Sequence, residues 1–96
     1  MNDAERSALR DVLVGYFGDN TTERGVREML GVTQAREDFH ERYRGALETG
    51  LRAARAGDED VLVVVRELAP FLPDVAEAEK LLAEILTEYD RQYARG

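Results

Sequence analysis

The apolar positions between residues 3 and 17 recur every three or four residues, so they form one stripe along a predicted helix. This stripe consists of Leu9, Val12, Leu13, Tyr16 and Phe17. Gly18 follows where a left-handed C-terminal cap would lie, and we expect the helix to end there.

A second, shorter helix is predicted over residues 21–30. Asn20 is a good N-cap, and Glu23 three residues later completes a capping box. The apolar face of this helix consists of Val26, Met29 and Leu30. Gly25 weakens the helix by about 1 kcal/mol relative to alanine. Gly31 is expected to end it.

The third helix is the longest, at residues 34–56, and Thr33 is its expected cap. Its apolar series has the spacing of an amphipathic helix. The series consists of Phe39, Tyr43, Ala46, Leu47, Gly50, Leu51 and Ala54. Gly50 and the alanines are small, so another helix can approach closely there. Gly57 is expected to stop the helix.

The run "VLVVV" at residues 61–65 is typical of a buried strand as well as of a buried helix. Asp58 is a helix cap, and Glu59 and Asp60 suit a first turn. A lone strand would also lack a second strand to pair with anywhere in this sequence. We therefore interpret residues 59–68 as a short helix that is buried almost all round.

Two prolines follow this helix and predict an extended link. Pro70 and Pro73 enclose Phe71 and Leu72. We expect both enclosed side chains to fill the core.

The last helix is predicted at residues 75–94. Asp74 is its N-cap, and Glu77 three residues later forms a capping box. Its apolar stripe consists of Val75, Ala78, Leu82, Ile85, Leu86, Tyr89 and Tyr93. Residues 1–96 thus read as a single all-α domain, a compact bundle of about five helices.

Charge is distributed unevenly between the two parts of the chain. The net charge is −7. Residues 1–56 carry ten acids and nine arginines, whereas residues 57–96 carry ten acids against only four basic residues. An acidic surface repels nucleic-acid phosphates and attracts basic partners. Net charge of this size also serves plain solubility.

The expected location is the cytoplasm. There are no cysteines, so disulfides and thiolate metal sites are excluded. The charged start "MNDAERSALRD" has no apolar core of a signal peptide, and "VLVVV" is far too short to span a membrane.

Residues that could carry out catalysis are scarce. His40 is the only histidine and Ser7 the only serine, and nothing in their spacing indicates a triad. One histidine cannot form a zinc or di-iron site, and the loops lack the ligand spacing of a calcium site. We read His40 as a solvated surface residue. The prediction is a non-enzymatic protein without cofactor or metal.

The stretch "VREMLGVTQAREDF", residues 26–39, has the look of a DNA-reading helix-turn-helix with Gly31 in the turn. Arg27 stands where that motif wants a small residue, and Glu37 stands where it wants a buried aliphatic one. Further acids follow in the would-be recognition helix, which lacks a basic face for phosphates. Two helices meeting at a glycine cap is the preferred interpretation. A helix-turn-helix regulator is the alternative.

The candidate partner-binding surface is the acidic C-terminal part of the chain. It consists of Asp58, Glu59, Asp60, Asp74, Glu77, Glu84 and Glu88. Acids at helix starts also interact favourably with the helix dipole, which by itself explains their positions. The dipole does not explain why so few basic residues balance them.

Tyrosines serve cores as well as interfaces. We assign Tyr89 to the core and leave Tyr93 open between the two roles. A third alternative function is a structural module whose last helix forms a homo-oligomer through these two residues.

The segments "DFHERYRGALETGLRAARAGDEDVLVVV" and "PDVAEAEKLLAEILTEYDRQY" belong to a small, acidic, cysteine-free helical chain. Such a chain resembles the immunity proteins of bacterial toxin–immunity pairs, including those of contact-dependent growth inhibition systems. The resemblance implies a protein that binds and blocks a cognate toxin domain, often a nuclease whose basic cleft suits an acidic surface. It transfers no individual residue role.

Overall fold

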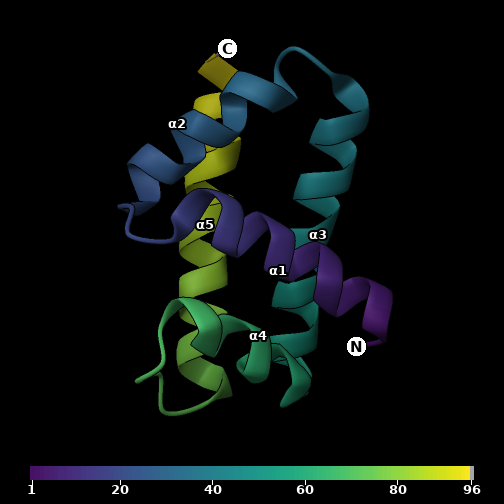
Figure 1. Cartoon of the computed structure of the whole chain (residues 1–96), viewed down its shortest axis with the longest axis vertical. Helices are drawn as coiled ribbons and strands as arrows, with labels where there is room; N and C mark the ends of the chain where they lie inside the picture. The colour runs from purple at the N-terminus through teal and green to yellow at the C-terminus, as the bar shows by residue number, and fades with distance from the viewer. Residues whose placement is uncertain (96) are drawn as a thin grey trace.

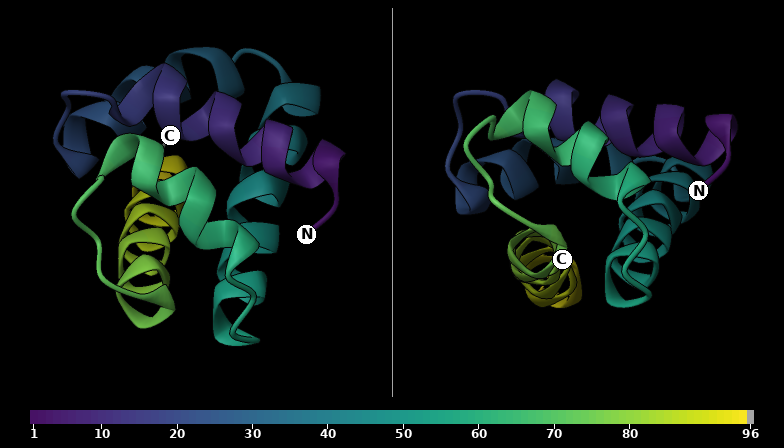
Figure 2. Two further views of the ribbon diagram at one scale, coloured as in Figure 1. Left: turned by 60° about the horizontal axis from the view of Figure 1, so that its bottom comes forward. Right: turned by 90° about the horizontal axis from the view of Figure 1, so that it is seen from below.

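The computed structural model describes residues 1–95, which form five α-helices and no β-strand. They are α1 (Asp3–Phe17), α2 (Thr22–Thr33), α3 (Glu37–Arg55), α4 (Asp60–Leu68) and α5 (Val75–Arg95). The antiparallel helices α3 and α5 form one layer, and α1 and α4 lie across them as a second (Figures 1 and 2). Helix α2 packs against α5 near the C-terminus. The predicted all-α bundle is confirmed, and "VLVVV" is helical.

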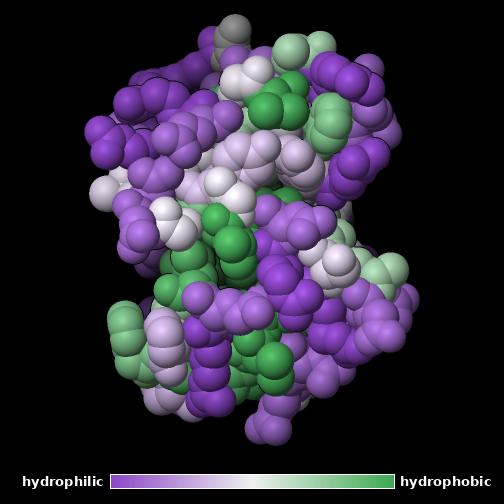
Figure 3. Space-filling view, in the orientation of Figure 1, coloured by the Kyte–Doolittle hydropathy of each residue, from purple (hydrophilic) through white to green (hydrophobic). Residues whose placement is uncertain are grey.

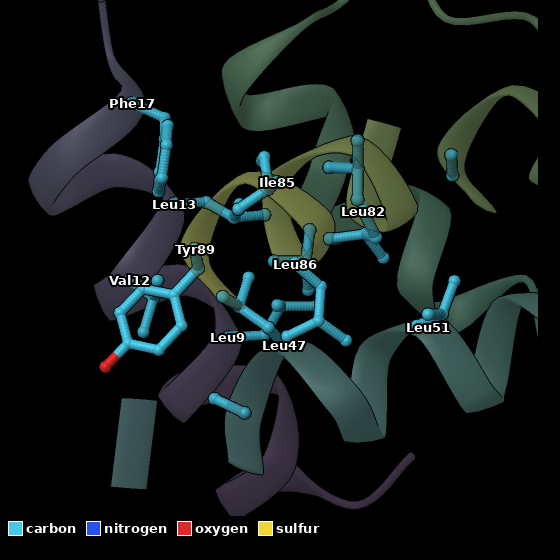
Figure 4. Packing of buried hydrophobic residues seen from close by; sticks show 14 of the residues in the cluster. Leu9, Val12, Leu13, Phe17, Leu47, Leu51, Leu82, Ile85, Leu86 and Tyr89 are labelled. Carbon is cyan, nitrogen blue, oxygen red and sulfur yellow. The ribbon is translucent and has the colours of Figure 1, made fainter. Parts of the chain in front are cut away.

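The hydrophobic core lies between the two layers, and every helix contributes to it (Figure 4). The largest fully buried side chains are Tyr89, Leu9, Leu13, Met29, Leu47, Leu82, Ile85, Val12, Val26, Val61, Val64 and Val65. Burying one side chain of this size stabilises the fold by roughly 1.5–3 kcal/mol. The stripes read from the sequence are therefore what holds the helices together.

Two glycines inside helices mark close approaches. A Cβ atom at Gly50 would lie 2.9 Å from a methyl carbon of Leu9, so α1 crosses α3 at this point. A Cβ atom at Gly25 would lie 2.7 Å from the carbonyl oxygen of Tyr16 and would overlap the Phe17 ring. The expected close approach at Gly50 is confirmed. Gly25, which weakens α2 locally, is needed for its packing on α1.

The predicted boundary between the second and third helices was wrong. Helix α2 continues through Gly31 to Thr33, and the turn consists of residues 34–36. Thr33 is only 1% exposed and packs inside instead of capping α3. Helix α3 begins after Arg36, which makes no side-chain cap bond. Gly31 is exposed within α2, and the helix continues through it at the usual cost of a helical glycine, about 1 kcal/mol relative to alanine.

The predicted caps around residues 18–21 were also displaced. Gly18 is extended, with φ −66° and ψ 121°, and Asp19 adopts the left-handed conformation with φ 57°. Aspartate tolerates that conformation because its short side chain bonds locally. Thr21, not Asn20, caps α2, and the Asn20 amide donates to the carbonyl oxygen of Tyr16 and to Glu28. The full capping box lies at the start of α1 instead.

The link between α4 and α5 departs from the prediction at one side chain. Leu72 is half-buried against the core as expected, but Phe71 is 86% exposed. The predicted extended link was wrong at this point, because Pro70 and Phe71 form a turn that the hydrogen bond from the Leu72 amide to the Ala69 carbonyl closes at 3.1 Å. Phe71 lies at the tip of this turn and is exposed, whereas Leu72, just after it, faces the core.

Candidate interaction surface at the start of α4 and α5

The predicted acids at the start of α4 divide between two sides of that helix. Gly57, with φ 77°, turns the chain after α3. Asp58 then accepts a hydrogen bond from the Asp60 amide at 3.0 Å, and its other oxygen lies 2.5 Å from the ammonium group of Met1. That ammonium lowers the pKa of Asp58. Asp60 pairs with Arg6 of α1 at 3.1 Å. Asp58 and Asp60 thus join α4 to α1.

Glu59 lies on the other side of the same helix start. It is exposed and forms no ion pair with any residue of the described chain. It lines an open hollow of about 470 Å³ together with Asp74 at the start of α5. The other lining residues are Leu62, Val63, Arg66, Pro73, Val75 and Ala76. We call this feature the corner hollow.

Asp74 reaches the corner hollow as the N-cap of α5. Its carboxylate accepts a hydrogen bond from the Glu77 amide at 3.0 Å, so the predicted cap is confirmed. Within residues 1–95 it has no cationic partner. The structure therefore brings together one acid from each of the two clusters seen in the sequence, although fourteen residues lie between them along the chain.

Arg66 is the only basic residue in the lining of the corner hollow. Its guanidinium donates to the carbonyl oxygens of Leu72 at 3.0 Å and Pro73 at 3.1 Å. These bonds fix the link to α4. The positive charge of Arg66 is thus oriented towards main-chain oxygens, and no carboxylate of the described residues pairs with it.

The remaining predicted acids lie elsewhere along α5. Glu77 is 3.9 Å from Lys80, one turn further on. Glu84 lines a separate shallow hollow with Glu88 and Lys80. Glu88 bonds to Arg91 and to the Gln92 amide, and these bonds lower its pKa. Glu84 and Glu88 therefore do not belong to the corner hollow.

Sequence reasoning missed the exposed apolar residues of this region. Val63 is 63% exposed and lines the corner hollow, and Phe71 lies two residues before Pro73. Hydrophobic residues reach the surface over α4 and along the link that follows it, between hydrophilic neighbours (Figure 3). A signal for Val63 existed: five consecutive apolar residues on a helix cannot all face one side.

The prediction that His40, the only histidine, is a solvated surface residue was wrong. Its side chain takes part in an aromatic contact between α3 and α5. The His40 Nδ1 atom lies 2.6 Å from the Tyr89 hydroxyl, and its ring stacks on Tyr93 with centroids 4.1 Å apart. Tyr89 is fully buried, which confirms its assignment to the core. Nearby, the Tyr16 and Tyr43 hydroxyls are 3.4 Å apart. We call these five residues the aromatic end.

The acids of the suggested recognition helix are at the surface. Glu37, Asp38 and Glu41 are exposed at the start of α3, and Arg36 pairs with Asp38 at 3.0 Å. Gly31 lies within α2, so the turn between the two helices contains no glycine. The alignment on Gly31 as turn residue does not describe this bend.

Neither a metal cluster nor a membrane span is found in the part of the chain that the structure describes. No three His, Cys, Asp or Glu side chains within residues 1–95 are grouped to hold a metal ion. None of the five helices combines the length and the apolar character needed to cross a membrane.

Comparisons with known proteins find no match for this chain among family models, curated proteins or solved structures. The corner hollow is one of several hollows of similar volume, and it differs from the others in joining the exposed side chain of Val63 to carboxylates that have no cationic partner among residues 1–95.

Proposed function

We propose that this chain is a non-enzymatic protein-binding module that neutralises a bacterial toxin domain, and that it binds through the corner hollow. One observation carries the proposal. Glu59 and Asp74, from two separate helix starts, line the same hollow beside the apolar residues Val63 and Val75. An apolar centre with a polar, solvent-accessible rim is the usual arrangement of a protein–protein contact surface, and the corner hollow has such an arrangement.

The acids would act mainly on the rate of association. A surface with excess carboxylates attracts a basic partner before contact, and this attraction raises the association rate constant. The corner belongs to residues 57–96, which carry ten acids and four basic residues. Salt screens such steering over about 8 Å at physiological ionic strength, so binding should weaken as salt is added.

The test removes charge from the corner hollow while keeping its shape. Glu59→Gln is nearly isosteric, and Asp74→Asn retains an N-cap residue of equal quality. Asp58 is unsuitable for this test because its carboxylate is paired with the Met1 ammonium. The full-length tagged chain serves as bait in a native lysate, washed at low and then at high salt, and retained proteins are identified by mass spectrometry.

We expect the unmodified chain to retain one basic protein in near-stoichiometric amount and to release it as salt rises. With that protein purified, the association rate constant of the double variant should be at least roughly threefold lower than that of the unmodified chain at low salt. At high salt the two rate constants should be equal. The matched control is Glu37→Gln with Glu41→Gln, which removes the same charge from exposed positions on α3.

Three results would contradict the proposal. Equal association rates for both double variants would show that the corner does not steer the partner. Saturable binding of mixed-sequence DNA at low salt would favour the helix-turn-helix regulator. Recovery of the bait alone, with a mass that grows with concentration in light scattering, would favour the homo-oligomer.

A further inference from the structure

Phe71 is exposed to an extent unusual for a large aromatic side chain. Its exposed fraction is 86%, compared with 63% for Val63 and 53% for Val14, the other exposed large hydrophobic residues of the described chain. A single exposed apolar residue is ordinary on a protein surface. What distinguishes Phe71 is the backbone that carries it.

The link on both sides of Phe71 is held in place. Pro70 and Pro73 fix their own φ angles and restrict the residues before them. Leu72 donates its amide to the Ala69 carbonyl at 3.1 Å. Arg66 donates to the carbonyl oxygens of Leu72 and Pro73. A fully exposed ring is thus presented from a braced backbone.

This arrangement suits binding more than folding. An aromatic ring carries 150–250 Å² of surface, and it has only two side-chain torsions to order. A loop that is already held avoids most of the ordering cost that association otherwise imposes. In the free chain the exposed ring contributes little to the core, which is built from other residues.

Phe71 is not part of the lining of the corner hollow, but Pro73 and Asp74, two and three residues further along the chain, are. The charge of that hollow therefore indicates what binds beside the ring. Glu59 and Asp74 have no cationic partner in the described residues, and the guanidinium of Arg66 is bonded to carbonyl oxygens. A basic surface complements this border. A second copy of the chain does not, because a two-fold contact here would bring Glu59 and Asp74 of both copies into one interface, and neither copy would supply a free cation for them.

We infer that Phe71 is the apolar anchor of this surface, and that its occupant is a folded basic protein with an apolar pocket bordered by arginine or lysine side chains. The inference rests on the proposed function and adds the residue that holds the complex together. Anchor and border have separate roles: the carboxylates speed association, and the ring slows dissociation.

The first experiment locates the contact. The full chain is made with Phe71→p-benzoylphenylalanine, a photo-crosslinking analogue, and in parallel with Val14→p-benzoylphenylalanine as a matched exposed apolar control. Both are irradiated in native lysate, and the crosslinked peptides are sequenced. We expect an adduct at position 71 only, to a peptide rich in arginine or lysine from the protein that the unmodified chain retains.

The second experiment separates the two roles kinetically with that purified protein. Phe71→Ala should raise the dissociation rate constant about tenfold or more, with the association rate constant unchanged and the same effect at low and high salt. Glu59→Gln with Asp74→Asn should show the opposite pattern. Val14→Ala should match the unmodified chain in both rate constants.

The outcomes separate failure of the anchor from failure of the function. If a basic protein is retained through the acids but position 71 gives no adduct and Phe71→Ala dissociates normally, Phe71 is not the anchor and the proposed function stands. If no basic protein is retained, both ideas are overturned. An adduct at position 71 to a second copy of this chain overturns the assigned occupant.

Discussion

Aromatic side chains are buried at one end of the α3–α5 pair and exposed at the other. At the aromatic end, Tyr89 is fully buried, and its hydroxyl bonds to His40 while Tyr93 stacks on the imidazole. At the other end, Phe71 in the α4–α5 link is 86% exposed. A helix stripe places an aromatic residue inside, whereas a link between prolines orders the backbone without burying the ring. Rigidity and burial are therefore separate properties in this molecule.

Helix α4 shows the same contrast in its charges. Its flank towards α1 is closed by ion pairs, among them Arg6 with Asp60 at 3.1 Å and Arg10 with Glu67 at 2.6 Å. Its flank towards α5 leaves Glu59 without a cationic partner in the described chain. Exposed ion pairs such as Arg10 with Glu67 contribute little stability. The two flanks of α4 therefore differ in the charge that they leave unpaired, and much less in their contribution to stability.

The largest difference in the free energy of unfolding should appear when one aromatic residue at each end of the α3–α5 pair is replaced by alanine. Tyr89→Ala removes a fully buried ring and should lower the free energy of unfolding by about 3–5 kcal/mol. Phe71→Ala should change it by less than about 0.5 kcal/mol, because the ring is exposed. Urea denaturation monitored by circular dichroism measures both. A loss above 1 kcal/mol for Phe71→Ala would show that the link packs against the fold.

A smaller effect should separate two glycines of α2. Gly25→Ala should destabilise the fold by about 1–3 kcal/mol, because its Cβ would press on the Tyr16 carbonyl oxygen and the Phe17 ring. Gly31→Ala meets no atom within 4 Å and should stabilise α2 by up to about 1 kcal/mol. Thermal unfolding of the two variants gives the sign of each effect. Equal signs would mean that α2 does not approach α1 this closely.

The smallest effect should appear only at alkaline pH and only at the aromatic end. Burial raises the pKa of Tyr16 to about 12, helped by its hydrogen bond to Tyr43. The unfolded chain loses this proton near its ordinary value of about 10. The contribution of Tyr16 to stability is therefore complete below pH 10 and is lost as pH rises towards 12.

Urea midpoints between pH 8 and 12 check this dependence, with Tyr16→Phe as the control. The variant should lose less stability over that range than the unmodified chain. Burial also raises the pKa of Tyr89, so a residual decrease is expected in the variant. Identical pH curves would show that the Tyr16 hydroxyl does not resist ionisation.

Periodicity was enough to predict the helices, because the stripes that fill the core are local patterns. It was not enough for the end of α2, since Gly31 looks like a stop until the burial of Thr33 is known. The displaced cap at Asp19 and the outward ring of Phe71 have the same cause. Each depends on which neighbours a segment meets in space.

The candidate site was predictable in part. The clusters around Glu59 and Asp74 were visible in the sequence, but their meeting in one hollow depends on how the starts of α4 and α5 lie together. The ion pairs of Asp58 with the Met1 ammonium and of Asp60 with Arg6 likewise depend on how α1 packs against α4. The way in which two helices cross cannot be read from the spacing of charged residues along the chain.

Arg66 holds the link between α4 and α5 through its main chain alone. The guanidinium of Arg66 donates two hydrogen bonds to the main-chain oxygens of residues 72 and 73, and every residue type has such an oxygen. The side chain at position 71 takes no part in them. The path of the link and the side chain that it exposes are therefore set by different residues, so a substitution at position 71 changes the exposed side chain while the link keeps its path.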